Sequence, residues 1–345
     1  MIDILMPKKQ DRLSKALAFA LHGVEYHFLG LDAPLQGRRV LFALATDACG
    51  MDEQTLRLLR RLRNNPSCME GSAGALLVDG ESELYTKQLA QEVVLSANMA
   101  GCAFFGKPLI EGTGSLYNQH ILAAQRGTGL QETYFSRARE LVRRLETFAA
   151  PKYDHPRLLV LHASERGRSG TLWLWEQLRM RLKDSCVIQE ISLQNGTIYD
   201  CRGCSYNACL HFAQNNTCFY GGAISETVLP AIRDCSAMLF LCPNYNDAVG
   251  ANITALFNRL TSLLLQSDLY DKYLFGIVVS GYSGSDLVAK QLLGTMCLNK
   301  TAMLPPRFCM LQTANDLTAV KSIPGIEKQL DDYADAMLSA MQKRI

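Results

Sequence analysis

A polar loop carries the residue types best suited to chemistry. It follows the apolar run Leu158–Leu161, precedes a predicted helix, and reads His162-Ala-Ser-Glu-Arg-Gly-Arg-Ser-Gly-Thr171. Free backbone N–H groups at the start of a helix attract anions. The loop adds three hydroxyl groups, two glycines that let the backbone approach a ligand, and two arginines: Ser164, Ser169, Thr171, Gly167, Gly170, Arg166 and Arg168. This composition predicts a cradle for a monophosphate, and a solvated polar loop is the alternative. The spacing fits neither GxxxxGK[ST] nor GxGxxG, which disfavours a nucleoside triphosphate or an ordinary dinucleotide fold.

A second feature is a group of four cysteines within 18 residues: Cys201, Cys204, Cys209 and Cys218. Four thiolates could hold an iron–sulfur cluster or a zinc ion, although a zinc site would more typically pair two Cys-x-x-Cys units. We expect structural or redox-active thiols here, and a metal site is the less favoured alternative. The other eight of the 12 cysteines are scattered, several in apolar runs, and are expected to pack as small apolar residues.

Short apolar runs alternate with helical periodicity in the second half of the chain. The expected strands are 158–161, 187–193, 237–242, 274–280 and 307–311, and the expected helices are 171–183, 226–234, 250–266, 286–298 and 326–343. This alternation predicts an α/β fold with a parallel sheet covered on both faces. Five such strands fit a doubly wound, flavodoxin-like sheet.

The first half has the same alternation in weaker form. The expected strands are 2–6, 25–31, 39–45, 74–79 and 102–105, and the expected helices are 11–22, 52–63, 84–98 and 132–148. Pro151 and Pro156 mark a linker, which predicts two domains, 1–150 and 151–345. Leu41-Phe42 and Arg61-Leu62 match Leu239-Phe240 and Arg259-Leu260 at one offset of 198 residues. The match favours an internal duplication over two α/β domains that share a common pattern.

Three stretches of the second half together resemble the NADPH-dependent FMN reductase family, which has the flavodoxin-like fold. The polar loop resembles the family's phosphate loop, Pro243–Arg259 its P-x-Y segment and following helix, and Val278–Gly284 its next strand-end loop. Cys201 and Cys204 fall between the second and third strands, as in many members. The resemblance covers about residues 157–345.

The resemblance implies an FMN site made by these loops. The phosphate would be held by Ser164, Arg166, Arg168, Ser169, Gly170 and Thr171. The isoalloxazine ring would be bordered by Pro243, Asn244, Tyr245, Asn246, Asp247, Ala248, Gly281, Tyr282, Ser283 and Gly284. The flavin carries the redox chemistry, so no catalytic side chain is expected.

The resemblance also implies an activity. The chain would pass electrons from NADH or NADPH to a small acceptor such as a flavin or a quinone, as an oxidoreductase that could form a homodimer. The alternative is an electron-transfer flavoprotein, with or without an iron–sulfur cluster at Cys201–Cys218.

The first half lacks the features of this site. The loop after its first strand, Pro7–Gln10, is short and has no glycine, serine or threonine. The counterpart of Pro243–Tyr245 is Ala45–Asp47, which has neither the proline nor the aromatic ring. The sequence therefore predicts a degenerate first copy that binds no flavin, and one FMN per chain.

Charge and hydropathy limit the classes of partner that we expect. Lys and Arg total 35 and Asp and Glu total 33, a net charge of +2, which provides no electrostatic footprint for nucleic acid or an anionic membrane surface. No apolar run reaches the roughly 18 residues of a membrane span, and charges stand where a signal peptide would be apolar. We therefore expect a cytoplasmic protein without membrane or nucleic-acid partners.

Overall fold

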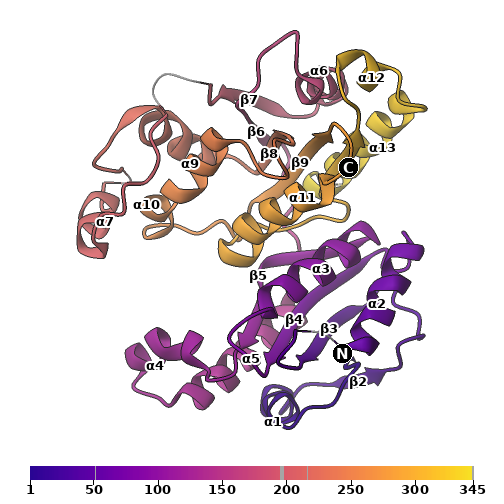
Figure 1. Cartoon of the computed structure of the whole chain (residues 1–345), viewed down its shortest axis with the longest axis vertical. Helices are drawn as coiled ribbons and strands as arrows, with labels where there is room; N and C mark the ends of the chain where they lie inside the picture. The colour runs from indigo at the N-terminus through magenta and orange to yellow at the C-terminus, as the bar shows by residue number, and fades with distance from the viewer. Residues whose placement is uncertain (51, 195–197, 216, 344–345) are drawn as a thin grey trace. The chain divides into compact units, whose positions relative to one another are not determined.

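The protein is described by a computed structural model that covers residues 1–50, 52–194, 198–215 and 217–343. The chain divides into two compact units, unit 1 (Met1–Ala149) and unit 2 (Ala150–Ile345), each described by itself below. Unit 1 is indigo to magenta and unit 2 is magenta to yellow in Figure 1.

Unit 2 is built on one five-stranded parallel sheet. Its strands are β6 (Arg157–His162), β7 (Val187–Ser192), β8 (Ala237–Pro243), β9 (Tyr273–Ser280) and β10 (Cys309–Thr313). They lie in the order β10-β9-β8-β6-β7. Counted within the unit, this is the order 2-1-3-4-5 of flavodoxin-like folds. The predicted doubly wound sheet is confirmed.

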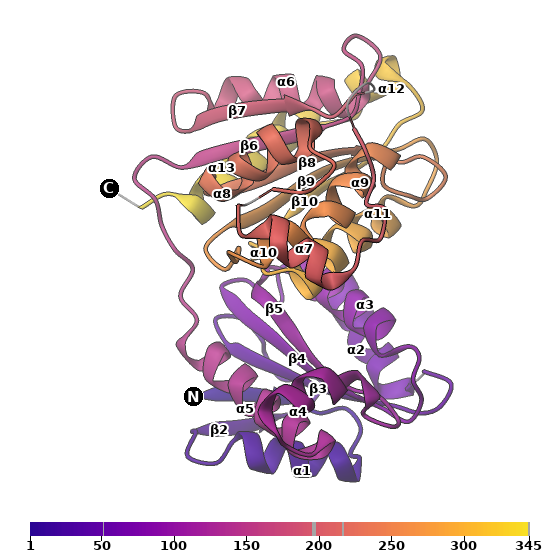
Figure 2. The ribbon, with the colours of Figure 1, turned by 90° about the vertical axis from the view of Figure 1, so that its left-hand side faces the viewer.

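Helices cover both faces of this sheet because the chain reverses its direction across the sheet after β7 and crossovers are right-handed. α6 (Gly170–Leu182) packs with α13 (Ile326–Met341) and the short α12 (Leu317–Lys321). α8 (Leu229–Asp234), α9 (Ala251–Arg259) and α11 (Ser285–Leu293), labelled in Figure 2, lie in the connections from β7 to β8, from β8 to β9 and from β9 to β10, which cross the sheet in the other direction. The predicted helix 250–266 is divided into α9 and α10 (Thr261–Leu264), and α7 (Tyr206–Ala213) was not predicted.

Unit 1 repeats the same topology. Its strands are β1 (Ile2–Leu5), β2 (Tyr26–Leu29), β3 (Arg39–Thr46), β4 (Ser72–Gly80) and β5 (Cys102–Gly112), again all parallel. Their order is β2-β1-β3-β4-β5, which is also 2-1-3-4-5. The third strands, β3 and β8, are the segments that the 198-residue offset matches. The two sheets therefore support the internal duplication.

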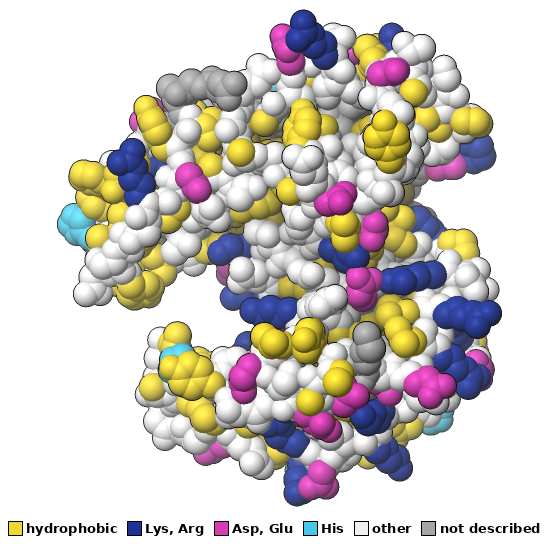
Figure 3. Space-filling view, viewed as in Figure 1, with side chains coloured by type: hydrophobic (Ala, Val, Ile, Leu, Met, Phe, Trp, Pro, Cys, Tyr) yellow, Lys and Arg dark blue, Asp and Glu magenta, His cyan; other side chains and the backbone are white. Residues whose placement is uncertain are grey.

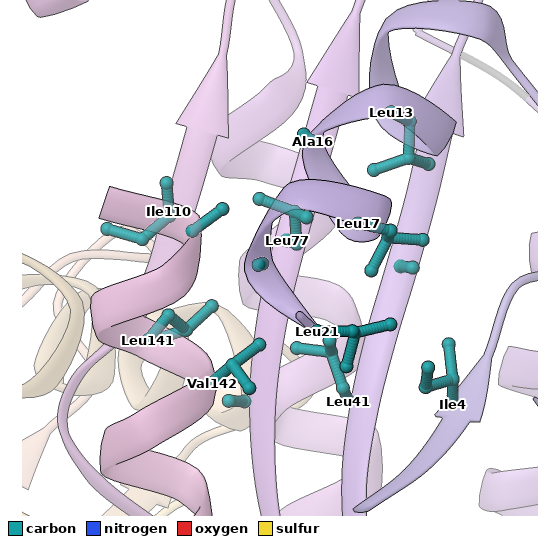
Figure 4. Close-up of a cluster of buried hydrophobic side chains, with 14 of the residues drawn as sticks. Ile4, Leu13, Ala16, Leu17, Leu21, Leu41, Leu77, Ile110, Leu141 and Val142 are labelled. Carbon is teal, nitrogen blue, oxygen red and sulfur yellow. The ribbon is translucent and has the colours of Figure 1, made fainter. Parts of the chain in front are cut away.

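The core of unit 1 shows how its helices meet the sheet. α1 (Asp11–Ala20) and α5 (Leu130–Thr147) pack together on one face, and α2 (Glu53–Asn64) and α3 (Thr86–Met99) pack together elsewhere in the unit. Leu13 and Leu17 of α1 lie one helical turn apart, and with Leu141 and Val142 of α5 they are buried over Leu77 of β4 (Figure 4). Each such leucine contributes about 1.5–3 kcal/mol by leaving water.

Two expectations for unit 1 need correction. The fifth strand continues from the predicted end at Phe105 to Gly112, through an irregularity in its pairing opposite Gly74 and Leu76. A 3₁₀ turn, η1 (Tyr117–Gln119), and α4 (His120–Arg126) fill a segment for which no element was predicted.

Two features of the structure concern the nucleic-acid and membrane partners considered above: the distribution of surface charge and the character of the helices. Basic and acidic side chains are interspersed on the face drawn in Figure 3. Within the described residues, no helix combines the length and apolar character that crossing a membrane requires.

Candidate functional site

Three loops meet at one edge of the unit 2 sheet. β8 pairs with β6 on one side and with β9 on the other, and all three strands are parallel. The loops that follow them, 163–169, 244–250 and 281–284, therefore leave the sheet side by side at its carboxyl edge. Ligands of doubly wound sheets bind at this edge, where the strand order reverses.

The first loop ends in a capped helix. The hydroxyl of Ser169 accepts a hydrogen bond from the N–H of Leu172 at 3.3 Å, and its Oγ lies 2.8 Å from Oγ1 of Thr171. A Cβ on Gly170 would lie 2.6 Å from Cγ2 of Val320, so glycine allows α6 to approach α12. Gly167 has a φ of +80°, a left-handed conformation that favours glycine. The predicted residues thus shape a loop that opens onto a helix N-terminus.

Ser164 carries a buried hydroxyl whose oxygen has no hydrogen-bond partner among the described residues. Its backbone N–H donates to Nδ1 of His162 at 3.4 Å. Burial lowers the pKa of His162, so its ring is neutral near pH 7 and Nδ1 can accept this bond. A buried unpaired hydroxyl is costly, and an oxygen of a bound anion would satisfy it.

The two arginines of the loop are paired with carboxylates. Arg166 lies 2.5 Å from Glu190 on β7 and 3.3 Å from Glu176 on α6. Arg168 is highly exposed and lies 3.6 Å from Glu165. Both loop arginines therefore have internal counter-ions, and the role of Glu190 was not predicted.

Asn244 joins the second loop to the third. Its Nδ2 lies 3.0 Å from Oγ of Ser280, and 3.1 Å from both the carbonyl oxygen of Ser283 and Oδ1 of Asp247. Its Oδ1 is buried and has no partner among the described residues. Gly284, with a φ of +88°, leaves room for this contact, because an added Cβ would lie 2.2 Å from Oδ1 of Asp247.

The second loop contains a tight turn. Tyr245 and Ala248 exchange backbone hydrogen bonds at 3.1 and 3.3 Å, and Asn246 and Asp247 between them both have positive φ. Gln291 of α11 braces the turn by accepting from the N–H of Val249 and donating to the carbonyl of Asp247, both at 2.9 Å. Sequence reasoning missed Gln291, which comes 44 residues after Asp247.

Two aromatic rings border these loops without being buried in the protein. The residue exposure is 58% for Tyr245 and 85% for Tyr282. Such rings leave apolar surface free for a flat ligand. Pro243 ends β8, and Gly281 comes directly after β9.

The cysteine-rich segment is anchored to α9. Arg259, almost fully buried, donates to the carbonyls of Tyr199 and Gly221 and to the hydroxyl of Ser225. Asn258 donates to Asp200 at 2.9 Å. The role of this Asn-Arg pair in holding the segment was not predicted.

The four clustered cysteines are free thiols. Burial, followed by the neighbouring thiols of Cys204, Cys201 and Cys218, raises the pKa of Cys209 and so disfavours its thiolate. In the part of the chain that is described, no group of three or more His, Cys, Asp or Glu side chains is arranged to hold a metal ion.

Six of the eight scattered cysteines are buried, as expected: Cys102, Cys186, Cys235, Cys242, Cys297 and Cys309. Burial raises the pKa of Cys242 to about 12, which fits a packing role. The expectation is wrong for Cys49, which is exposed in a turn, and Cys68 is only half-buried.

The corresponding edge of unit 1 has a pocket of about 400 Å³, lined by Arg12, Gly80 and Gly114 among others, and its arginine is bound internally. The Arg12 guanidinium makes hydrogen bonds of 2.8–3.1 Å to the fully buried carboxylate of Asp79. It also donates to the carbonyls of Gly80, Thr113 and Gly114. One arginine thus joins the start of α1 to the ends of β4 and β5.

The fold and the loops of unit 2 define a flavodoxin-like domain with a candidate ligand site at its carboxyl edge. Residues 156–316 match the sequence model of the NADPH-dependent FMN reductase family. The predicted family resemblance is confirmed over this range, which is just under half of the chain.

The solved structures that match parts of this chain are distant in sequence. One is RosB with the bound intermediate 8-demethyl-8-formylriboflavin-5'-phosphate, at 13% identity, 53% coverage of this chain, 79% coverage of that chain and a TM-score of 0.41. Another is rubredoxin oxygen:oxidoreductase from Desulfovibrio gigas, at 13% identity, 73% and 53% coverage and a TM-score of 0.35. A comparison with curated proteins finds no match.

Proposed function

We propose that unit 2 binds FMN and that the protein is an FMN-dependent oxidoreductase. The family match over residues 156–316 supports a flavin-dependent oxidoreductase. The observation that carries the FMN site is the serine- and glycine-containing loop 163–169, which opens onto the N-terminus of α6. Two buried oxygens at the same edge, Ser164 Oγ and Asn244 Oδ1, have no partner among the described residues. Such atoms are costly unless a ligand satisfies them.

The donor set fits the chemistry of this cofactor. A hydroxyl group and helix N–H groups suit a phosphate, since both donate hydrogen bonds to its oxygens. The free oxygen of Asn244 can accept a bond from an N–H, such as the one on the polar edge of an isoalloxazine ring. Tyr245 and Tyr282 supply apolar faces for the ring itself.

Each loop has a distinct task in the proposed mechanism. Ser164, Ser169, Gly170 and Thr171 would hold the phosphate, and Asn244 to Ala248 with Gly281 to Gly284 would orient the ring. The Asn244 amide joins the second loop to the third, and Gln291 joins the second loop to α11, so the ring would meet loops that are held in place. FMN, when bound, supplies the hydride and electron transfer. The protein's contribution is therefore binding and orientation.

We further propose NADH or NADPH as the electron donor and a small molecule, such as a flavin or a quinone, as the acceptor. The family match supports a nicotinamide donor. Unit 1 has the same strand order, but Pro7–Gln10, the counterpart of the first loop, has no glycine, serine or threonine, which supports one flavin per chain.

Flavin titration of the full chain tests this proposal. We expect one FMN per chain, and anaerobic NADH or NADPH should bleach the flavin absorption. Two FMN per chain would contradict the assignment to unit 2 alone. Binding without bleaching by either nicotinamide would favour an electron carrier, and no flavin binding at all would refute the proposal.

A further inference from the structure

Glu190 is the centre of a polar cluster beside the first loop. In the parallel register it pairs with Val160, and its carboxylate lies 3.3 Å from Nε2 of His162. It accepts hydrogen bonds from Arg166 Nη2 at 2.5 Å and from Trp175 Nε1 at 2.9 Å. The side chain is only 15% exposed. One carboxylate on β7 thus contacts both the start and the middle of the loop.

Arg166 and Ser164 face the same cavity. A pocket of about 560 Å³ is lined by Ser164, Arg166, Glu190 and Ser192, among others. The pocket therefore brings together an unpartnered buried hydroxyl, an arginine and the carboxylate that neutralises it. An anion that reaches Ser164 would lie beside the same arginine.

We propose that Glu190 is an internal counter-ion that competes with the flavin phosphate for Arg166, and so sets how strongly the site prefers FMN to riboflavin. This inference rests on the proposed flavin site. Carboxylate and phosphate both suit the planar guanidinium fork, so the two anions compete for the same donors.

The exchange leaves no buried charge alone. When Arg166 turns to phosphate, Glu190 keeps the hydrogen bond from Trp175 and the contact with His162, and Arg179 lies 3.8 Å away. Ser164 gains the partner that it lacks. Phosphate binding then costs the separation of one ion pair, which riboflavin binding does not require.

Glu190→Gln is the informative variant, because glutamine can keep one oxygen for Trp175, which bonds Oε2, but replaces Oε1, the oxygen that contacts Arg166 and His162, and has no charge to hold Arg166. Glu176→Gln is the matched control, since Glu176 contacts the same guanidinium from an exposed position at 3.3 Å. Binding of FMN and of riboflavin to the full chain is measured by flavin fluorescence titration. Because FMN and riboflavin differ only in the phosphate group, the ratio of the two dissociation constants isolates the contribution of this group to binding.

Glu190→Gln should raise the preference for FMN over riboflavin by about tenfold, and Glu176→Gln by less than about twofold. Arg166→Gln should lower the preference for FMN over riboflavin. The double variant with Glu190→Gln should keep that lowered preference, because no arginine is left for the carboxylate to compete for. An unchanged ratio in Glu190→Gln, or equal weakening of both flavins, would overturn the inference.

Two further outcomes are informative. If Glu190→Gln does not fold by circular dichroism, Arg166→Gln decides, and an unchanged preference in that variant overturns the inference. If the wild-type chain binds neither flavin, the proposed function fails, which is a different result from flavin binding with an unaltered ratio.

Discussion

Arg12→Ala should destabilise unit 1 far more than an ordinary surface substitution. The Arg12 side chain is 23% exposed, and its partner, the Asp79 carboxylate, is 0% exposed. Removing the guanidinium leaves a carboxylate buried without its counter-ion and removes the donors to three carbonyls, those of Gly80, Thr113 and Gly114. The start of α1 then loses its connection to the ends of β4 and β5.

The expected loss is about 3–5 kcal/mol, the usual cost of breaking a buried ion pair by removing one partner. Lys15→Ala on the same helix is the control. Lys15 lies 2.8 Å from Asp11 in an exposed pair four residues apart, which is worth only about 0.3–0.5 kcal/mol. The two substitutions remove a cation from the same helix and differ mainly in burial.

Urea unfolding followed by two probes measures the effect. Both tryptophans, Trp173 and Trp175, are in unit 2, so their fluorescence reports on that unit. Native-state hydrogen exchange at the amides of β3 and β4 reports on unit 1. We expect Arg12→Ala to lower the hydrogen-exchange protection of unit 1 and to leave the fluorescence transition of unit 2 unchanged. If Arg12→Ala lowers the unfolding free energy of unit 1 by less than about 1 kcal/mol, the ion pair does not stabilise this unit as we expect.

Three other predictions concern unit 2. Ser164→Ala should weaken FMN binding roughly tenfold, because one hydrogen bond to a charged group is lost, and should leave the unfolding transition unchanged. A folded variant that binds FMN with unaltered affinity in a titration would contradict this. Gly284→Ala should weaken flavin binding, since the new Cβ would meet Asp247 at 2.2 Å. Gly325→Ala, with a similar positive φ but open space around it, measures the backbone cost alone and should leave flavin affinity unchanged. Metal analysis should find neither iron nor zinc in stoichiometric amount, and iron with acid-labile sulfide would establish a cluster at Cys201, Cys204, Cys209 and Cys218.

The sheets could be predicted from the sequence because strands covered on both faces are continuously apolar. Leu158–Leu161 is such a run, and it lies inside β6. The predicted fifth strand ends too early, at Phe105, because Gly106, Lys107 and Pro108 interrupt the apolar pattern and are typical of strand ends. The chain passes Lys107 with a φ of +51° and then pairs again, Leu109 with Leu76. This recovery depends on the neighbouring strand, which a local pattern does not contain.

The loops of the site could be predicted and their internal partners could not. The first loop can be identified from a local pattern, a strand followed by a polar loop and a helix, which does not depend on the rest of the fold. Glu190 comes 24 residues after Arg166, and Ser280 comes 36 residues after Asn244. These contacts depend on which strands are neighbours in the sheet. For the same reason, the pairing of both loop arginines with carboxylates could not be predicted from the sequence.

The two units show what a doubly wound sheet requires at its open edge. Parallel strands end there with polar backbone groups that need partners, and helices cover only the faces of the sheet. In unit 1 the Arg12 guanidinium binds three of these carbonyls and a buried carboxylate, so the protein supplies the partners itself. Among the described residues, Ser164 Oγ and Asn244 Oδ1 are buried without partners at this edge of unit 2, and Gln10 Oε1 and Thr46 Oγ1 are buried without partners at the corresponding edge of unit 1. Unpaired oxygens alone therefore do not distinguish the two copies. We place the flavin site in unit 2 because residues 156–316 match the FMN reductase family model and because Pro7–Gln10, the counterpart of the first loop, has no glycine, serine or threonine.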